Sequence, residues 1–451
     1  MSDRLTGLGR SKFVRDTLAA QTTGVVQALT YLATSVLIAR GLGPTETGRW
    51  SAALEIALLV TFVFSAGLET AALSRYAEAV GRSDERGKLQ VLAGVLKLGA
   101  MLAVGVAAVV AVFGPHFADS YYGDRAVGEA AAWLGLTAAI EVFRTLAVTA
   151  LTGARRWAAY ARFDIAANLV RVGLVALAVL GFGSVASLVV AALVHAVISA
   201  SLGLFAYGRT RRDGGALAPP ALREVIAAAP GASIAGFFGL TWMLAVNKTV
   251  HRTVTRLGTV IIPGLAVLVA GGEGMAEGAA YKVAFVLNLV LQNAVGAIAS
   301  EFLSTLGHKL NEAPLAEQGE LLRRVSLTAG ALSIAATLIS VPLAWLAVRY
   351  IYGPGFGGSF DYFVLLAVGN LFLGFGVIVG PFYIYADRLR ASVVQNVIYA
   401  ALVVAMMAWA VPRFGPQGLA GAVGFGHALL LGHLVYIGLW YRRQRAVSGA
   451  P

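Results

Sequence analysis

The stretch AVNKTVHRTVTRLGTV at residues 245–260 decides the fold, because it places positive charge inside an otherwise apolar chain. Lys248, Arg252 and Arg256 are four residues apart, so on a helix they form one cationic stripe. Apolar residues flank the stretch on both sides. As an exposed loop, the stripe would separate two membrane spans; as a helix, it would belong to one long span.

The composition indicates a polytopic membrane protein. The chain has 451 residues, of which 58% are hydrophobic and 13% charged, and its mean hydropathy is +0.76. A soluble domain carries about 25% charged residues. There is no cysteine, which excludes disulfides, thiol catalysis and cysteine metal sites. The net charge of +12 would suggest nucleic-acid binding in a soluble protein, but the placement of the basic residues points to membrane orientation instead, and we expect no nucleic-acid partner.

Twelve apolar runs predict the transmembrane helices. Each run is long enough to cross a bilayer, which takes about 20 residues, and the first reads as an uncleaved membrane helix. The predicted fold is therefore an all-α polytopic membrane protein with twelve transmembrane helices. The predicted spans are 18–39, 51–73, 89–113, 127–150, 163–182, 186–207, 230–271, 281–303, 325–350, 361–385, 392–411 and 418–440.

The basic residues indicate how these spans are oriented. They also decide whether the stripe is an exposed loop or part of one long helix. Of the 35 Lys and Arg, segments on one side of the membrane hold 23, and the loops on the other side hold only Arg40, Arg49, Arg125, Arg349 and Arg413. Because basic loops stay in the cytoplasm, both termini are predicted to be cytoplasmic. Two separate spans at 225–246 and 257–271 would reverse every later loop. The stripe therefore belongs to one long seventh span.

Short words recur about 232 positions apart. FG at 182–183 returns at 414–415, and His195-Ala196 returns as His427-Ala428. Six spans per repeat is an even number, so both halves have the same orientation, with a binding site expected at their interface. The sequence predicts two six-helix lobes related by a parallel pseudo-two-fold repeat around a central cavity. Their predicted bounds are 1–215 for helices 1–6 and 216–451 for helices 7–12.

Three segments carry a resemblance to a known family. LIARGLGPTETGRW (37–50), GLETAALSRYAEA (67–79) and RLGTVIIPGLAVLVAGGEGMAEGAAYKVA (256–284) resemble polysaccharide-export flippases of the multidrug/oligosaccharidyl-lipid/polysaccharide exporter superfamily. The chain departs from their pattern at Trp50, where Tyr is usual, and at Gly258, where many relatives have an acidic residue.

The resemblance implies a transporter rather than an enzyme. Such a flippase moves a polyprenyl-diphosphate-linked oligosaccharide from the cytoplasmic to the outer leaflet of the bacterial cytoplasmic (inner) membrane by alternating access. The implied partners are the lipid bilayer, the anionic lipid-linked oligosaccharide and the polysaccharide assembly machinery. The sequence contains no HExxH, GxSxG or nucleotide-binding motif, so we expect no catalytic residue, cofactor or metal, and no direct drive by ATP.

Basic residues within the spans are the predicted substrate ligands. A charge at mid-bilayer is costly unless it is paired or faces a water-filled cavity, and arginine forks suit a diphosphate. The predicted substrate-binding residues of a cationic cavity are Arg144, Arg171, Lys248, Arg252 and Arg256. Two alternatives stay open. The stripe could be a cytoplasmic entry to the seventh helix, its cations reaching headgroups, and Arg144 could simply neutralise Glu141.

Acidic residues within the spans are predicted to couple ions or to pair charges. They are Glu55, Glu69 and Asp164. Glu55 and Glu69 are fourteen residues apart, close to four helical turns, so they are expected on one helix face. Asp164, Asn168 and Arg171 also share a face, either lining the cavity or forming a structural clasp.

Three rival functions differ in their sequence requirements. An ion-coupled multidrug exporter of the same superfamily should have an acidic and aromatic site, whereas basic residues outnumber acids within these spans. A membrane polymerase or ligase would need a large external loop, which the predicted topology lacks. A scaffold without transport activity would leave the charges within the spans unexplained.

Overall fold

The fold is described from a computed structural model of the chain. The structure describes residues 2–65, 68–213, 215, 217–235, 256–268, 274–312, 315–379, 382–383, 386 and 388–448. Within these ranges the chain is helical and contains no β-strand. The chain divides into two compact units, Met1–Leu42 with Arg49–Thr249 (unit 1) and Gly43–Gly48 with Val250–Pro451 (unit 2).

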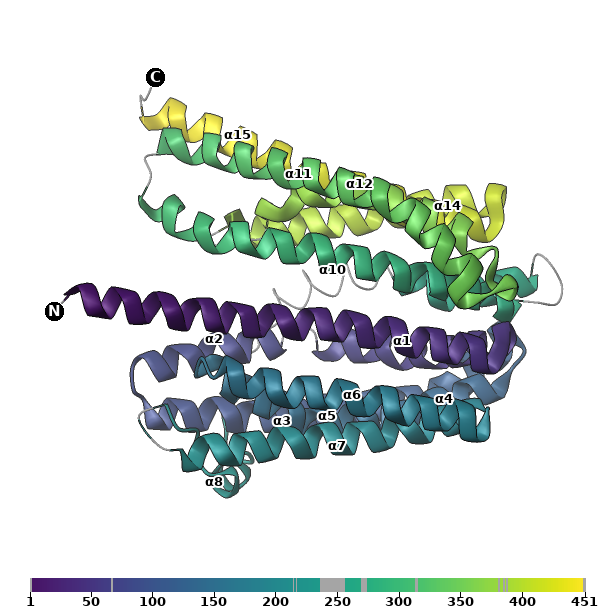
Figure 1. Cartoon of the computed structure of the whole chain (residues 1–451), viewed down its shortest axis with the longest axis horizontal. Coiled ribbons are helices and arrows are strands. Elements are labelled where there is room, and N and C mark those ends of the chain that lie inside the picture. The colour runs from purple at the N-terminus through teal and green to yellow at the C-terminus, as the bar shows by residue number, and fades with distance from the viewer. Residues whose placement is uncertain are drawn as a thin grey trace. The chain divides into compact units, whose positions relative to one another are not determined.

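Unit 1 is a bundle of long helices. In it α3 packs against α2, α4 and α5, while α7 packs against α5 and α6 (Figure 1). The short α8, which follows α7, lies against α3 through the fully buried Val225. The helices are α1 (Ser2–Ser65), whose residues 43–48 belong to unit 2, α2 (Leu68–Gly81), α3 (Glu85–Tyr122), α4 (Arg125–Gly135), α5 (Thr137–Gly153), α6 (Trp157–Phe182), α7 (Val185–Arg212) and α8 (Leu222–Ala228).

Unit 2 is a second bundle built around α12. Helices α10, α11 and α14 all pack against α12, and one buried cluster, which includes Tyr281, Tyr362 and Val423, forms its core. Its elements are the helix Arg256–Leu268, α10 (Gly274–Glu312), α11 (Leu315–Leu346), η1 (Ala347–Tyr352), η2 (Pro354–Phe356), α12 (Ser359–Leu373), η3 (Gly374–Ile378), α14 (Leu389–Gly426), η4 (His427–Leu430) and α15 (Leu431–Ser448).

Two of the long helices each consist of two helical segments joined at a break. The helical conformation of α1 breaks at Gly43, with φ 76° and ψ 177°, and that of α14 breaks at Gly415, with φ 56° and ψ −139°. Both breaks have positive φ, which glycine adopts without steric cost, and each is followed by a proline, which restricts helix continuation. Each break therefore separates two of the predicted spans.

The predicted all-α polytopic fold class is confirmed. Within the described ranges, nine helices are long and apolar enough to cross a membrane. Two of these, Gln21–Phe62 and Leu389–Gln444, have 42 and 56 residues. They contain the breaks at Gly43 and Gly415 and are long enough for two spans each. Of the predicted seventh span, residues 230–235 and the helix Arg256–Leu268 are described. With it, the helices accommodate the predicted twelve spans.

The repeat is visible in the backbone. Gly183, with φ 60°, joins α6 to α7, and Gly415, with φ 56°, joins the two halves of α14. These glycines are the FG words separated by 232 residues, and they occupy the turns between spans five and six and between spans eleven and twelve. The two units are defined by how the helices pack, whereas the predicted lobes are defined by the sequence repeat. The predicted lobe boundary after residue 215 therefore stays a prediction.

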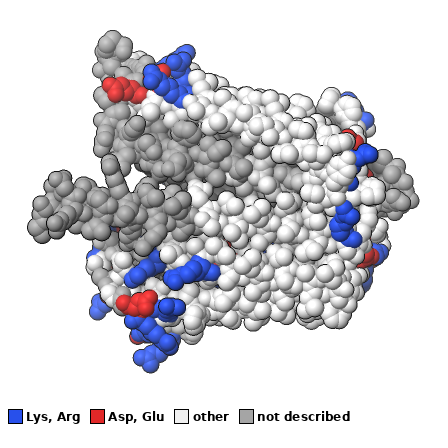
Figure 2. All heavy atoms as spheres, viewed as in Figure 1, with Lys and Arg blue, Asp and Glu red and all other residues white. Residues whose placement is uncertain are grey.

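The lipid-facing character of the bundle is visible on its surface. Figure 2 shows Lys and Arg gathered toward the ends of the helices, with a wide band between them that carries almost no charge. Large apolar side chains are exposed along the helices, among them Leu180 at 77% and Phe182 at 73%. Such exposure suits contact with lipid tails and would be unusual in water.

Candidate functional site

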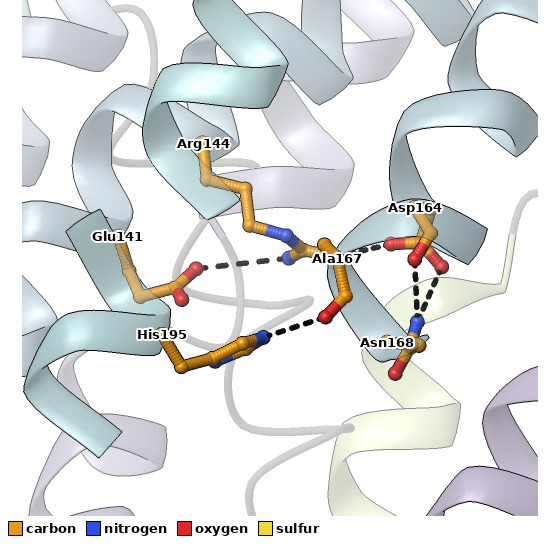
Figure 3. A network of polar contacts seen from close by, with 6 residues as sticks. All are labelled: Glu141, Arg144, Asp164, Ala167, Asn168 and His195. Atoms are coloured by element: carbon orange, nitrogen blue, oxygen red, sulfur yellow. Dashed lines mark hydrogen bonds and ion pairs between the residues drawn. The ribbon is translucent and has the colours of Figure 1, made fainter. Parts of the chain in front are cut away.

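A charged cluster joins α5 and α6 in unit 1. One guanidinium nitrogen of Arg144, Nη2, donates a hydrogen bond to Asp164 Oδ1 at 2.7 Å, and Nη1 lies 3.7 Å from Glu141 Oε2 (Figure 3). Asn168 Nδ2 donates to Asp164 Oδ2 at 3.1 Å and to the Asp164 carbonyl at 2.8 Å. Glu141 and Arg144 share a face of α5 and Asp164 and Asn168 a face of α6, because each pair is one turn apart.

Further titratable groups surround this pair of helices. Glu69, in the first turn of α2, is close enough to interact electrostatically with Glu141. His195 of α7 makes a hydrogen bond through Nε2 with the Ala167 carbonyl at 3.2 Å (Figure 3). Arg144, Glu69, Glu141 and Asp164 are called the arginine–carboxylate cluster. With three carboxylates and one guanidinium, it has the chemistry to take up a proton.

Arg144 is thus engaged by two carboxylates. Arg144 pairs with Glu141, as the alternative proposed, with Nη1 3.7 Å from Oε2. Its closer partner is Asp164 on the neighbouring helix, with Nη2 2.7 Å from Oδ1. Asp164 is buried, its side chain only 2% exposed, so the clasp between α5 and α6 is present. A role of Arg144 in substrate binding stays a prediction.

Arg171 has a different environment, although it lies two turns beyond Asp164 on the same helix. Its Cζ lies 4.9 Å from the centroid of the Tyr31 ring, and Nη2 donates to Thr34 Oγ1 at 3.4 Å. Within the described residues, no carboxylate pairs with this half-buried guanidinium. The sequence analysis missed Tyr31 and Thr34. They could have been noticed as two polar residues that lie one helical turn apart within an apolar run.

The described end of the cationic stripe lies against an aromatic ring in unit 2. Arg256 begins the helix Arg256–Leu268, and its Cζ lies 5.6 Å from the centroid of Phe285 on α10. Lys282 Nζ lies 5.3 Å from the same ring, and Lys282 is buried, with 7% of its surface exposed. Lys248 and Arg252 lie outside the described residues.

The missing acidic residue at Gly258 has a packing explanation. A Cβ atom at this position would lie 2.3 Å from the Cζ and hydroxyl oxygen of Tyr281 on α10. Such an approach leaves no space for a side chain. The Tyr281 ring therefore occupies the place that an acidic side chain would take.

The two predicted carboxylates of the second span lie in different environments. Glu55 is fully buried in α1, whereas Glu69 is exposed at the start of α2. Glu55 lies in α1, which is described to Ser65, and Glu69 lies in α2, which is described from Leu68. The expectation that the two share one helix face stays a prediction. Glu69 belongs to the arginine–carboxylate cluster.

Unit 2 contains a neutral counterpart to that cluster. Asn370 Nδ2 on α12 donates to Asn288 Oδ1 on α10 at 2.5 Å, and Gln292 Nε2 donates to Asn370 Oδ1 at 3.2 Å. Ser333 on α11 donates to the Asn370 carbonyl at 2.6 Å. This amide cluster (Asn288, Gln292, Ser333 and Asn370) joins three helices. Asn288 and Gln292 thus form hydrogen bonds between helices.

A search of the described residues for metal ligands gives a negative result. No group of three or more His, Cys, Asp or Glu is placed there to hold a metal ion. The chemistry that these residues support is ion pairing, hydrogen bonding and binding of anions by arginine.

Comparison with known proteins gives a family and a fold. A family model described as polysaccharide biosynthesis protein matches residues 13–304. No curated protein matches the sequence significantly.

Solved structures similar to this chain are transporters. An inward-facing multidrug resistance MATE family transporter of the MOP superfamily has a TM-score of 0.70 at 16% identity, covering 96% of this chain and 98% of its own. An outward-facing one has a TM-score of 0.64 at 16% identity, covering 98% and 97%. A MOP superfamily transporter from Pyrococcus furiosus, described as having a binding pocket of reverse polarity that suggests a different function, scores 0.66 at 17% identity, covering 98% and 96%.

Proposed function

Because the chain belongs to the polysaccharide biosynthesis protein family, we propose that it is a flippase for a lipid-linked oligosaccharide. It is a multi-pass membrane transporter of the MOP superfamily, whose fold is known in inward- and outward-facing conformations. The cargo of the proposed flippase is a polyprenyl-diphosphate-linked oligosaccharide, carried from the cytoplasmic to the outer leaflet. Its location is the bacterial cytoplasmic membrane, with both termini in the cytoplasm.

The environment of Arg171 is the observation that carries this proposal. An arginine within a membrane helix is costly, and it is a functional residue by default when no carboxylate neutralises it. In the described chain Arg171 stacks on the Tyr31 ring and donates to Thr34, and it pairs with no carboxylate there. A diphosphate would supply the two negative charges and the acceptor oxygens that a guanidinium fork binds well.

The cationic stripe would add positive charge to the same ligand. In this proposal Arg256, whose Cζ lies 5.6 Å from the centroid of the Phe285 ring, offers its guanidinium. Arg252 and Lys248, four and eight residues earlier in the sequence, are the further proposed ligands. Alternating access then exposes these cations first to the cytoplasmic and then to the outer leaflet.

The arginine–carboxylate cluster would couple transport to an ion. Its three carboxylates exceed its one guanidinium, so a proton can join it without creating excess positive charge. Taking up that ion would weaken the bond between Arg144 and Asp164 and thus change the packing of α5 on α6. Glu55 is a further proposed pairing group, and it is fully buried.

The experiment compares two arginines of α6 in a strain lacking the gene. We expect Arg171→Gln to fail in complementation, so that lipid-linked oligosaccharide accumulates on the cytoplasmic leaflet while protein levels remain normal. Arg162→Gln is the matched control, because Arg162 is exposed on the same helix and donates to the Ala158 carbonyl. Normal export by the Arg171→Gln variant would refute the proposed role of Arg171.

An ion-coupled multidrug exporter is the second candidate, and two observations favour it. The similar solved structures are multidrug transporters, and unit 1 places carboxylates next to one another, as a cationic drug would require. The same deletion strain separates the candidates. Lowered drug tolerance without accumulated lipid-linked oligosaccharide would favour the exporter.

A further inference from the structure

A concave pocket lies in unit 2 where α11 ends, and the proposed transport mechanism does not use it. Its volume is about 570 Å³, within the range of about 300–1,000 Å³ typical of small-molecule sites. Trp345, Arg349 and Tyr350 line it from the end of α11 and η1, and Pro354 and Phe360 line it from the following segment. Positive-inside orientation places this end of the ninth span at the outer surface.

A π-helical turn builds the pocket. In η1 the Gly353 amide donates to the Val348 carbonyl at 3.0 Å, five residues earlier, and Gly353 then ends the turn with φ 99°. Val348 and Tyr352 are buried by this wide turn, whereas Arg349 and Tyr350 remain exposed. Single π-helical turns are uncommon and occur frequently at functional sites.

Arg349 differs from other arginines assigned to the outer side. Arg49 pairs with Asp124 at 2.7 Å, and Arg125 pairs with Glu129 at 3.0 Å. Arg413 Nη1 donates to the carbonyl of Trp409 at 2.7 Å. The Arg349 guanidinium lies 5.6 Å from the Trp345 ring centroid, and in the described part of the chain no carboxylate pairs with it. Within the described chain, its charge is therefore left without a neutralising carboxylate.

An apolar strip leads from the pocket toward the middle of the membrane. Ile339, Leu343 and Leu346 are spaced four and three residues apart on α11, which places them on one helix face. They are 62%, 58% and 44% exposed. Above them, Trp345 and Tyr350 are amphipathic side chains of the kind found at membrane interfaces. A guanidinium over an apolar strip matches a lipid that has an anionic head and an acyl chain.

From this arrangement, we propose that the pocket binds the phosphate-bearing headgroup of an anionic lipid in the outer leaflet. The Arg349 guanidinium donates to the phosphate oxygens, Trp345 and Tyr350 pack beside the glycerol region, and one acyl chain lies along Ile339, Leu343 and Leu346. The site is separate from the transported cargo, and its existence does not depend on the proposed flippase activity.

Lipid binding to the purified full-length protein tests this proposal. Native mass spectrometry in detergent, with phosphatidylglycerol as the probe and phosphatidylcholine as the uncharged comparison, should detect one tightly bound phosphatidylglycerol. We expect Arg349→Gln to weaken its binding about tenfold, which corresponds to about 1.4 kcal/mol. Arg413→Gln should bind it as the wild type does, because Arg413 is also stacked on a tryptophan at 4.8 Å but bonds its own helix.

A polyprenyl phosphate added as a third probe identifies the source of the headgroup. If binding of both anionic lipids depends on Arg349, the site accepts any outer-leaflet lipid with a phosphate. If only polyprenyl phosphate binding depends on Arg349, the site is specific for the carrier lipid. Equal affinities of the wild type, Arg349→Gln and Arg413→Gln for both anionic lipids would overturn the proposal. So would equal binding of phosphatidylcholine, since the aromatic residues would then serve only as an interfacial belt.

Discussion

Each of the two units buries a polar cluster, but the two clusters have opposite chemistry. Unit 1 contains Arg144 and Asp164 in direct contact at 2.7 Å, whereas unit 2 contains Asn370 bonded to Asn288 and Gln292. The units share turns at corresponding places, as Gly183 and Gly415 show. The comparison teaches that the repeat preserves the backbone while the polar chemistry inside each half diverges. Charge in unit 1 suits a changing ion-pair state, and neutral amides in unit 2 suit fixed packing.

Removing the arginine of the charged cluster should have the largest effect on stability. Arg144→Ala leaves Asp164, whose side chain is only 2% exposed, without its cation, and we expect a loss of about 3–5 kcal/mol in the free energy of unfolding. Denaturant titration in detergent micelles measures this loss. The double variant Arg144→Met with Asp164→Leu is the control and should recover most of the stability. Equal stability of Arg144→Ala and the wild type would show that Asp164 is not held by this bond.

Neutralising the acid should have a smaller effect than removing the arginine. Asp164→Asn keeps the shape and can still accept a hydrogen bond, and Arg144 retains Glu141 at 3.7 Å. We expect a loss of about 1–3 kcal/mol, together with a transport rate that responds less to pH than that of the wild type. Proteoliposome assays with and without a pH gradient measure the second effect. An unchanged pH response would remove Asp164 from the coupling role and leave it a structural clasp.

Disrupting the neutral cluster should affect stability but not coupling. Asn370→Ala removes the bonds to Asn288 and Gln292, and we expect a loss of about 1–2 kcal/mol, the upper range for side-chain hydrogen bonds between membrane helices. Asn293→Ala is the matched control, because Asn293 is exposed on the same helix as Asn288. If Asn370→Ala changed the pH response of transport, the contrast between a charged and a neutral cluster would fail.

Removing an exposed ion pair in unit 2 should have the smallest effect. Glu320 accepts hydrogen bonds from Arg323 at 2.9 Å and from Arg324 at 2.8 Å near the start of α11. Exposed pairs of this kind contribute little to stability because water and salt screen them. We expect no measurable change in thermal unfolding for Glu320→Gln. A clear destabilisation would indicate that unit 2 also depends on charge.

Local patterns in the sequence were reliable for the fold and for pairs within one helix. The gaps between the predicted spans contain Gly43, Gly183 and Gly415, where the backbone has positive φ. The Glu141–Arg144 pair followed from a spacing of three residues. The expectation that Glu55 and Glu69 share one helix face stays a prediction.

Partners from different helices were beyond sequence reasoning. Nothing in the sequence placed Asp164 closer to Arg144 than Glu141 is, or placed Phe285 next to both Arg256 and Lys282. Nor could the sequence show that Tyr281 takes the space beside Gly258. Each of these contacts depends on the distance between two helix axes, on which hydropathy carries no information.

The sequence by itself determined the class of this protein and its internal repeat, and it predicted the orientation. Those properties depend on hydropathy, on the placement of basic residues and on chain order, all of which are one-dimensional. Only the tertiary structure decided which charges are neutralised. Arg144 and Arg171 are both arginines within predicted membrane spans, yet one contacts a carboxylate and the other an aromatic ring and a hydroxyl. A charge in a bilayer is stabilised by an opposite charge within a few ångströms. Helix packing decides whether such a neighbour is present, and a charge without one can bind a ligand.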